Sequence, residues 1–335
     1  MMEKPWLNSY PPGVPVDIDL DAYHSIVDLL EKSCDKYKTR MAYHNLGSEL
    51  SYADLDYLTR NFAASLQDMG LQPGDRIALM MPNVLQYPVA LFGALRAGLI
   101  IVNTNPMYTA RELRHQLVDS GARVIVVVEN FASVLASVRD EVPLEHIITT
   151  GVGDMLNFPK SLLVNFVLRH VKKSIPAWSL PGSVKFLDVL NKGSKLPLQP
   201  AHISYDDVAF LQYTGGTTGE SKGALHTHKT LFMGMLNQTV AERVVPSDVY
   251  MLTGQMFHIP VALAMNYMAH GCPVVLINFD AQLALEVIQQ ERVSAFLGIT
   301  TMLNWMMAVE GFADYDISSL RNIQYGGGPM PRSVV

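Results

Sequence analysis

The sequence predicts an α/β protein in which two mostly parallel sheets are covered by helices, and three observations lead to this fold class. Short apolar segments alternate with amphipathic segments of helical period over residues 75–138. The same alternation returns from residue 208, after residues 155–200 have interrupted it. Strands in strict rotation with helices form parallel sheets that are buried on both faces. Two α/β subdomains are therefore expected.

An N-terminal arm is expected over residues 1–24, because residues 5–21 contain four prolines and little periodicity. The first α/β subdomain is assigned to residues 25–200. The second is assigned to residues 201–335. No internal sequence repeat relates the two halves, so the division rests on their shared architecture.

Capping residues delimit the helices of the first subdomain. Ser51 is expected as an N-cap with Gly70 as a stop, and Thr109 with Glu112 forms a capping box for a helix that Gly121 ends. The expected elements are helix 25–37, helix 50–70, strand 76–80, helix 85–97, strand 99–102, a helix from 109, strand 124–128 and helix 131–138.

The second subdomain continues the same pattern. Its expected elements are strand 208–211, an extended segment at 225–227, a helix from 230, strand 273–277, helix 281–291, strand 295–299, helix 301–309 and strand 321–325. Residues 255–279 are strongly apolar, but His258, Pro260 and Asn266 are among the residues that interrupt them. A membrane span needs about 18 uninterrupted apolar residues, so this stretch is predicted as a loop, a buried helix and a strand.

The composition is that of a folded globular protein, with 49% apolar and 17% charged residues in 335. A net charge of −6 argues against nucleic acid as the main partner, because phosphate backbones are bound by basic surfaces. Cys34 and Cys272 lie in apolar surroundings, which indicates a reducing compartment without a disulfide framework. Residues 1–8 lack the apolar core of a signal peptide, so a cytoplasmic location is expected.

The function prediction depends on residues 213–224, which read Tyr-Thr-Gly-Gly-Thr-Thr-Gly-Glu-Ser-Lys-Gly-Ala. Four glycines leave backbone N–H groups uncovered, while hydroxyl groups and Lys222 add donors and a cation, a combination that suits a polyphosphate. The segment is not a Walker A loop, because Lys222 lies between Ser221 and Gly223, and Thr217 breaks the dinucleotide-binding pattern. It is expected between two strands. The alternative is a glycine-rich surface turn.

The same residues carry a resemblance to a known family. Together with Gln212 and the pair Thr227-His228, the segment resembles the AMP-binding signature of the adenylate-forming enzymes. Within them it is most similar to the bacterial long-chain fatty acid–CoA ligases, or acyl-CoA synthetases. The resemblance covers nearly the whole chain and includes residues 6–8, 79–83, 86–93, 96–98, 102–103 and 326–331.

The resemblance implies the N-terminal domain of such an enzyme and its two-step reaction. A fatty carboxylate attacks the α-phosphate of ATP to give an acyl-adenylate and pyrophosphate, and the thiol of coenzyme A then displaces AMP to form a thioester. The implied substrates and cofactors are a long-chain fatty acid, ATP, coenzyme A and Mg²⁺, and a homodimer is a compatible assembly. Enzymes of this kind act mainly through positioning and charge neutralisation.

The resemblance also implies site residues. Lys222 would neutralise the β- and γ-phosphates, Thr214 would bind them, and His258 would orient the acyl end; these three are the implied catalytic residues. The implied nucleotide-binding residues are Tyr213, Thr214, Gly215, Gly216, Thr217, Thr218, Gly219, Glu220, Ser221, Lys222, Gly223, Ala224, Gly326, Gly327 and Gly328. No residue is assigned as a metal ligand.

Two of these assignments have a simpler alternative. An imidazole at the mouth of an apolar tunnel can orient a carboxylate or steer a thiol, but a histidine among apolar residues, as His258 is, is more often a satisfied core residue when taken alone. The family also more often has Pro-Leu where this chain has Gly254-Gln255. The glycines at 326–328 allow a flat ligand to approach the carboxyl edge of a sheet, or form only a turn.

Residues 162–171 are apolar and end in a basic cluster with Arg169, His170, Lys172 and Lys173. One interpretation is a basic amphipathic segment that lies peripherally on the inner face of an anionic membrane. The other is an ordinary surface helix whose basic C-terminus complements the helix dipole.

Several parts of the family pattern would lie beyond Val335. They are the Tyr-Gly-x-Thr-Glu motif with its magnesium-binding glutamate, the ribose-binding aspartate and the C-terminal lid, so the lid is expected to be absent from this chain. Two alternatives stay open: a non-catalytic module that binds ATP or acyl chains, and an adenylating domain for another carboxylic acid.

Overall fold

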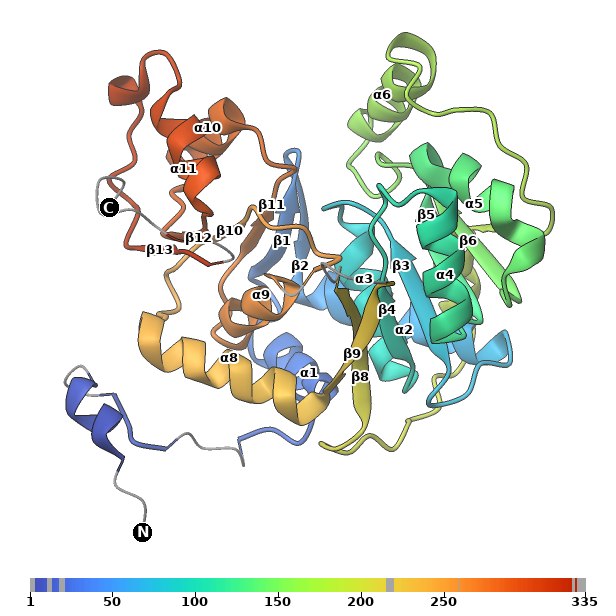
Figure 1. The fold of residues 1–335 in the computed structure, drawn as a ribbon, viewed down its shortest axis with the longest axis horizontal. Helices are drawn as coiled ribbons and strands as arrows, with labels where there is room; N and C mark the ends of the chain where they lie inside the picture. Colours follow the sequence, from blue (N-terminus) through green and yellow to red (C-terminus); the bar gives the residue numbers. More distant parts are fainter. Residues whose placement is uncertain are drawn as a thin grey trace.

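Two sheets with helices on their faces make up the fold (Figure 1). The computed structural model describes residues 4–10, 14–17, 22–214, 220–258, 260–326 and 329. Among these residues, the first sheet has the spatial order β7 (Val184–Lys185), β6 (His146–Thr150), β5 (Val124–Val128), β3 (Arg76–Met80), β4 (Ile100–Asn103), β8 (Val208–Thr214) and β9 (Lys222–Thr227).

The described strands of the second sheet have the spatial order β13 (Asn322–Gln324), β12 (Ala295–Leu297), β10 (Tyr250–Leu252), β11 (Val274–Leu276), β1 (Met41–Asn45) and β2 (Ser48–Ser51). Within each described sheet the pairs are parallel, except that β9 runs antiparallel to β8 and β2 antiparallel to β1. The predicted class, α/β with two mostly parallel sheets, is confirmed.

The described helices are α1 (Ile26–Lys36), α2 (Tyr52–Asp68), α3 (Gln86–Arg96), α4 (Ala110–Ser120), α5 (Ala132–Val138), α6 (Lys160–Phe166), α7 (Phe186–Gly193), α8 (His228–Glu242), α9 (Pro260–Ala269), α10 (Ala281–Glu291) and α11 (Thr300–Met307). Shorter helical turns are η1 (Pro5–Ser9), η2 (Glu129–Phe131), η3 (Arg139–Glu141), η4 (Val167–Val171, of π type) and η5 (Phe312–Asp314). In the predicted N-terminal arm, the structure describes η1 and short segments beside it.

The two faces of each sheet bury different cores, and these fix the layers. In β3, Ile77 and Leu79 face a central core shared with the second sheet, whereas Ala78 and Met80 face a core beneath α4 and α5. Helix α3 is buried at every residue, as expected for a helix that contributes to the central core. A third core lies between the second sheet and helices α10 and α11. The layers therefore follow the order helix, sheet, helix, sheet, helix.

The boundary expected near residue 200 does not separate the sheets. Strand β1 pairs in parallel with β11, with Tyr43 opposite Val274, so an early segment lies in the second sheet. Strand β8 pairs with β4, with Val102 opposite Leu211, so a segment after residue 200 completes the first sheet. An apolar run indicates that a segment is a strand but carries no information on its partner.

The β1–β2 hairpin is absent from the sequence prediction. Its turn is formed by Leu46 and Gly47, which both have positive φ angles, of 48° and 70°. Two-residue hairpin turns of this kind are normally signalled by Asn-Gly or Asp-Gly. Because a leucine stands in the first position here, the usual signal is missing.

The predicted helix caps are confirmed. Ser51 accepts a hydrogen bond from the Asp54 amide and Asp54 reciprocates, which completes a capping box at the start of α2. Thr109 and Glu112 form a second capping box at α4. Gly121 ends α4 in the left-handed region, at φ 60°.

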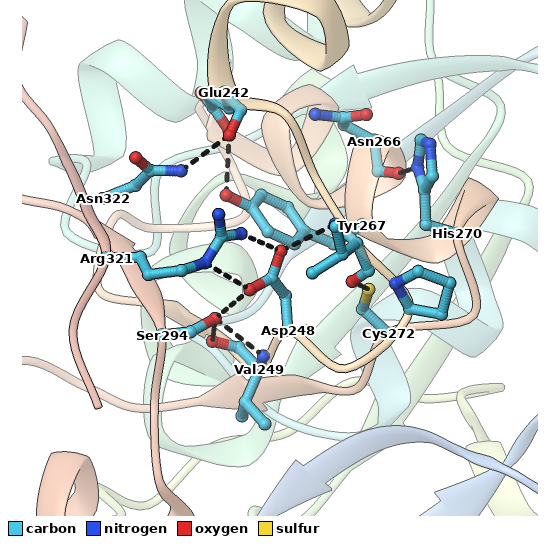
Figure 2. Close-up of polar contacts among 12 residues, drawn as sticks. Glu242, Asp248, Val249, Asn266, Tyr267, His270, Cys272, Ser294, Arg321 and Asn322 are labelled. Carbon is cyan, nitrogen blue, oxygen red and sulfur yellow. Dashed lines mark hydrogen bonds and ion pairs between the residues drawn. The ribbon is translucent and has the colours of Figure 1, made fainter.

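A polar cluster around the buried Asp248 ties the amino ends of three strands in the second sheet together (Figure 2). Arg321 and Ser294 both donate to Asp248, at 3.1 Å from the guanidinium Nε and 2.7 Å from the hydroxyl. Burial by itself raises the pKa of Asp248, but hydrogen bonds from Arg321, the Val245 amide and Ser294 outweigh it and hold this pKa below its ordinary value. The three residues lie just before β10, β12 and β13, and thereby align these strands.

Two further expectations concern residues 255–279 and the cysteines. The predicted loop, helix and strand over 255–279 are confirmed by α9 and β11. Within the described part of the chain, no helix has the length and apolar character needed to cross a bilayer. Cys34 and Cys272 are both buried as free thiols.

Substituting Gly193 should destabilise the fold. A Cβ atom at Gly193 would lie 1.7 Å from the backbone oxygen of Asn61 on α2, so Gly193→Ala must push α7 away from α2. We expect a loss of about 1–3 kcal/mol in the free energy of unfolding, measured by urea titration. Gly234→Ala in α8 is the matched control. It meets no atom within 4 Å and should be neutral or slightly stabilising, so equal losses in both variants would contradict the packing explanation.

His228 should make stability depend on pH. Its Nδ1 accepts a hydrogen bond from the Ile26 amide at 3.2 Å, and burial lowers its pKa to about 4. Because the unfolded chain takes up a proton near pH 6.5 and the folded chain resists it, stability should fall as the pH drops from 6.5 to 4, by about 3 kcal/mol. Urea titrations across this range should show that stability falls less in His228→Gln than in the wild-type chain. In His202→Gln, at an exposed position, stability should fall as much as in the wild-type chain.

Candidate active site

The predicted phosphate-binding segment lies in an antiparallel hairpin of β8 and β9. The expectation that it connects two strands is confirmed, but its ends belong to the strands themselves, because Thr214 pairs directly with Lys222. Lys222, Gly223 and Ala224 are thus residues of β9, and α8 begins at His228, two residues before the expected position. Of the connecting residues, 215–219 lie outside the described part of the chain.

The residues at the mouth of the hairpin differ in exposure. Thr214, Glu220 and Lys222 are exposed, Ser221 is half-buried and Tyr213 is buried. A hydroxyl and an ammonium group are therefore accessible on facing positions of two paired strands. This arrangement can bind an anion without desolvating the ammonium group.

Helix α4 braces the hairpin through two residues one turn apart. The Tyr213 hydroxyl donates to Asp119 at 2.6 Å, and the Nε2 atom of His115 lies 2.9 Å from the carbonyl oxygen of Ser221. Burial, followed by the hydrogen bond to Asp119 and its negative charge, raises the pKa of Tyr213 well above its ordinary value. The phenol therefore stays protonated and keeps donating.

An open cleft of about 560 Å³ lies between α4 and the hairpin. It is lined by His115, Asp119, Glu220, Ser221, Lys222 and Gly223. A Cβ atom at Gly223 would lie 3.0 Å from the Tyr213 ring, so glycine lets this ring pack against the facing strand. The cleft brings together Lys222 and three other predicted binding residues.

Asn83 organises the other side of the site. Its side-chain amide donates to the carbonyl oxygens of Leu252, Gly254 and Ile277, at 3.3, 3.0 and 2.8 Å. Its carbonyl oxygen accepts from the Met256 amide at 2.8 Å. One buried side chain thus connects the end of β3 with the ends of β10 and β11, and fixes the loop that leads to His258.

His258 lies at the end of this loop. Its backbone amide donates to the carbonyl oxygen of Gln255 at 3.0 Å, and its ring lies 4.6 Å from that of Phe257, measured between centroids. The residue is exposed, whereas Met256 and Phe257 are buried, which does not fit the interpretation of His258 as a core residue. Partial burial still lowers the pKa of its imidazole.

Gln212 links the hairpin to the His258 loop. Its Nε2 donates to the Phe257 carbonyl oxygen at 3.3 Å, and its Oε1 accepts from Asn103 at 2.9 Å. Asn103 in turn accepts from the Tyr87 hydroxyl at 2.7 Å. This buried chain of hydrogen bonds runs from α3 across β4 and β8, and brings the strand before Thr214 next to the loop of His258.

The third predicted segment begins at Gly326, just after β13. Gly326 is half-buried, and a Cβ atom added there would meet no atom within 4 Å, while Gly327 and Gly328 lie outside the described residues. The hydroxyl of Thr253, after β10, donates to the Leu297 carbonyl oxygen at the end of β12. The end of β13 pairs with β12 through the Gly298 amide and Gln324. The carboxyl ends of these strands therefore lie along one edge.

Sequence reasoning assigned no role to Asn83, Asn103, Gln212, His115 or Asp119. Asn83 lies three positions after β3 and Asn103 ends β4, and polar side chains at the carboxyl end of parallel strands are a recognisable signal. Nothing comparable marks His115 and Asp119, because their partners lie about 100 residues away. Among the described residues, no group of three or more His, Cys, Asp or Glu side chains is arranged to hold a metal ion.

The chain matches a known protein family. The model of the AMP-binding enzyme family matches residues 30–335. The chain belongs to the AMP-binding enzyme family. The family resemblance carried by residues 213–224 is thereby confirmed.

Several bacterial members of this family are similar over the whole chain. The long-chain-fatty-acid–CoA ligase of Escherichia coli O157:H7 is 41% identical over 343 residues, which are 100% of this chain and 61% of that protein. The protein of the same name from Haemophilus influenzae is 42% identical over 344 residues, 99% of this chain and 61% of that protein. The chain thus spans about three fifths of the length of these relatives.

Solved structures share the fold. A long-chain-fatty-acid-CoA ligase from Archaeoglobus fulgidus superposes with a TM-score of 0.80 at 22% identity, over 97% of this chain and 62% of that one. An anthranilate CoA ligase, crystallised with anthranoyl-AMP, gives 0.79 at 22% identity, over 94% and 57%. At this identity, the structural similarity establishes only the fold of the chain.

Removing the Asn83 side chain should loosen the His258 loop. Asn83→Ala removes the partner of the Met256 amide and of the Gly254 and Ile277 carbonyl oxygens, and leaves the Leu252 carbonyl oxygen with only the Ile277 amide, so we expect a loss of about 3 kcal/mol in the free energy of unfolding. Hydrogen exchange at the Met256 amide should also be faster than in the wild-type chain, while exchange at amides of the sheet changes less. Asn191→Ala, at an exposed position of α7, is the control. Unchanged exchange at Met256 would contradict the assigned role.

Proposed function

We propose that this chain takes part in the ATP-dependent activation of long-chain fatty acids and their transfer to coenzyme A, as the nucleotide- and acyl-binding portion of a fatty acid–CoA ligase. The observation that carries the proposal is the direct pairing of Thr214 with Lys222 at the mouth of the β8–β9 hairpin, in a member of the AMP-binding enzyme family. Relatives named long-chain-fatty-acid–CoA ligase, at 41% and 42% identity, support the substrate class.

The hairpin would bind the triphosphate. The Lys222 ammonium group neutralises the β- and γ-phosphates, and the Thr214 hydroxyl donates to them. The residues between them are proposed to add hydroxyl and backbone N–H donors: Gly215, Gly216, Thr217, Thr218 and Gly219. Such preorganised donors stabilise the negative charge of the triphosphate, which water would otherwise have to stabilise. Gly326, Gly327 and Gly328 would admit the flat adenine ring at the carboxyl edge of the second sheet.

The acyl group would enter from the side of the His258 loop. Because its pKa is lowered, the His258 ring is neutral at neutral pH and can hydrogen-bond the fatty carboxylate without adding charge. One carboxylate oxygen then bonds to the α-phosphorus of ATP while the bond to pyrophosphate breaks. In the second step the thiol sulfur of coenzyme A bonds to the acyl carbon, its proton is lost, and AMP leaves.

Magnesium belongs to the proposed reaction as the partner of ATP. The described residues contain no set of three acidic, cysteine or histidine side chains arranged around a common point. We assign no step to the ion.

The proposal includes a cytoplasmic location with peripheral contact to the inner face of the membrane, and a homodimer as a compatible assembly. The free and buried thiols of Cys34 and Cys272 suit a reducing compartment. Nucleic acid is not a proposed partner, given a net charge of −6.

Lys222 provides the direct test. Lys222→Ala should weaken ATP binding to the chain by about tenfold or more, which corresponds to about 1.4 kcal/mol, because one charge-assisted contact to the triphosphate is lost. Affinity is measured by calorimetric titration with ATP and Mg²⁺, and turnover by pyrophosphate release with palmitate.

Lys229→Ala is the matched control, since Lys229 is an exposed lysine at the start of α8, seven positions further along the chain. It should leave ATP affinity unchanged. Equal affinity of the wild-type chain and Lys222→Ala would refute the role of Lys222. Binding of ATP without pyrophosphate release would favour the non-catalytic alternative, and release with benzoate but not palmitate would favour another acid.

A further inference from the structure

Helix α6 and the turn η4 that continues it are attached to the protein by their polar side. The amide of Asn165 donates to Asp154 at 2.8 Å, and its oxygen accepts from the Gly153 amide at 2.8 Å. One turn later, Arg169 forms an ion pair with Glu129. In a helix of a globular protein the apolar side normally faces the core. Here the side that faces the protein is held by hydrogen bonds and charge, and of the apolar side chains of α6 only the half-buried Val164 packs against the central core among the described residues.

The apolar side is left in solvent. We call Phe158, Leu162, Leu163 and Phe166 the apolar crest; they are exposed by 81%, 65%, 61% and 57%. No residue of α6 or η4 is buried. Within α6, Leu162 and Phe166 are one helical turn apart and Leu163 adjoins them, so these three form a stripe, and Phe158 is exposed just before the helix begins. Contiguous apolar side chains exposed in this way mark an interaction surface.

Basic side chains flank the crest. Between Asp154 and Asp188 the sequence contains Lys160, Arg169, Lys172, Lys173 and Lys185 but no Asp or Glu, in a chain whose net charge is −6. Lys172 and Lys173, which we call the basic flank, are exposed directly after η4, beside the exposed Val171. An apolar stripe bordered by cations complements the acyl boundary and headgroups of an anionic bilayer.

The crest and the candidate site both follow the carboxyl ends of strands in the first sheet. The chain leaves β6 at its carboxyl end to form α6, and leaves β8 at its carboxyl end to form the hairpin mouth. Strands β6, β5, β3, β4 and β8 are successive and parallel, so the two exits are four strand spacings apart, about 19 Å. Figure 1 shows α6 at the periphery, projecting beyond the sheet on the side away from α8.

We propose that the apolar crest and the basic flank form the face by which this chain docks onto an anionic lipid surface. The crest side chains enter the boundary between headgroups and acyl chains, while Lys172 and Lys173 contact phosphate groups. A second copy of the chain is a poorer occupant, because two basic flanks brought together would repel each other. A helix that needed only a cationic C-terminus for its dipole would not expose three large apolar side chains, Leu162, Leu163 and Phe166.

This inference rests on the proposed function only for the membrane contact included there. Its test uses lipid vesicles without nucleotide or fatty acid, so its failure and the failure of the ligase proposal can be told apart.

Vesicle flotation tests the docking face. The chain should float with phosphatidylglycerol vesicles and much less with phosphatidylcholine vesicles, and added salt should weaken binding. The combined variant Leu162→Ser, Leu163→Ser, Phe166→Ser should lower the partition coefficient roughly tenfold or more, and Lys172→Gln with Lys173→Gln should remove the preference for anionic lipid. Tyr57→Ser, at an exposed aromatic on α2, is the control and should bind as the wild-type chain does.

A site-specific probe reports insertion directly. Phe166→Cys can be labelled with an environment-sensitive fluorophore, because Cys34 and Cys272 are buried and burial raises the pKa of each thiol to about 12. Its emission should shift to shorter wavelength with anionic vesicles, whereas the label in Tyr57→Cys should not respond. Equal flotation of the wild-type chain and the triple variant would overturn the proposal. So would concentration-dependent dimerisation that the triple variant abolishes while vesicles have no effect.

Discussion

The carboxyl ends of two separate sheets are held together by buried amide side chains, and the candidate site depends on this junction. The strand ends carry backbone carbonyl groups that are shielded from water, and each needs a hydrogen-bond donor. Asn83 supplies it for three of them and accepts from the Met256 amide. In the same way, Gln212 donates a hydrogen bond to the Phe257 carbonyl oxygen in the His258 loop, and Asn103 donates to Gln212. These hydrogen bonds, together with the apolar packing of Met256 and Phe257 in the central core, fix the loops between the sheets.

This junction explains how residues far apart in sequence come to share a site. The hairpin of β8 and β9 belongs to the first sheet and the His258 loop to the second. The hairpin itself is oriented from the opposite side, where α4 holds it through Tyr213 and Ser221. Lys222 is left exposed between these supports. A rigid frame around an accessible cation is what electrostatic stabilisation of a polyphosphate requires.

Much of the fold follows from local signals. The N-cap at Ser51, the capping box at Thr109 and the β-branched run at 124–128 are read correctly from the sequence, because their partners lie within one turn or because the pattern itself is diagnostic. The strand exchange between the sheets is not predictable in this way. The β1–β2 hairpin lacks the usual turn residues, and nothing in β8 distinguishes β4 from β11 as a partner.

The sequence by itself determined the fold class and the family, and it predicted the chemistry of residues 213–224, because these depend on residue type and on spacing along the chain. Only the tertiary structure decided that Lys222 faces Thr214 across a strand pair, that Asn83 and Gln212 join the sheets, and that α6 presents its apolar side to solvent. Each of these is a relation between residues 8 to 194 positions apart, and the direction in which a side chain points depends on what packs against it.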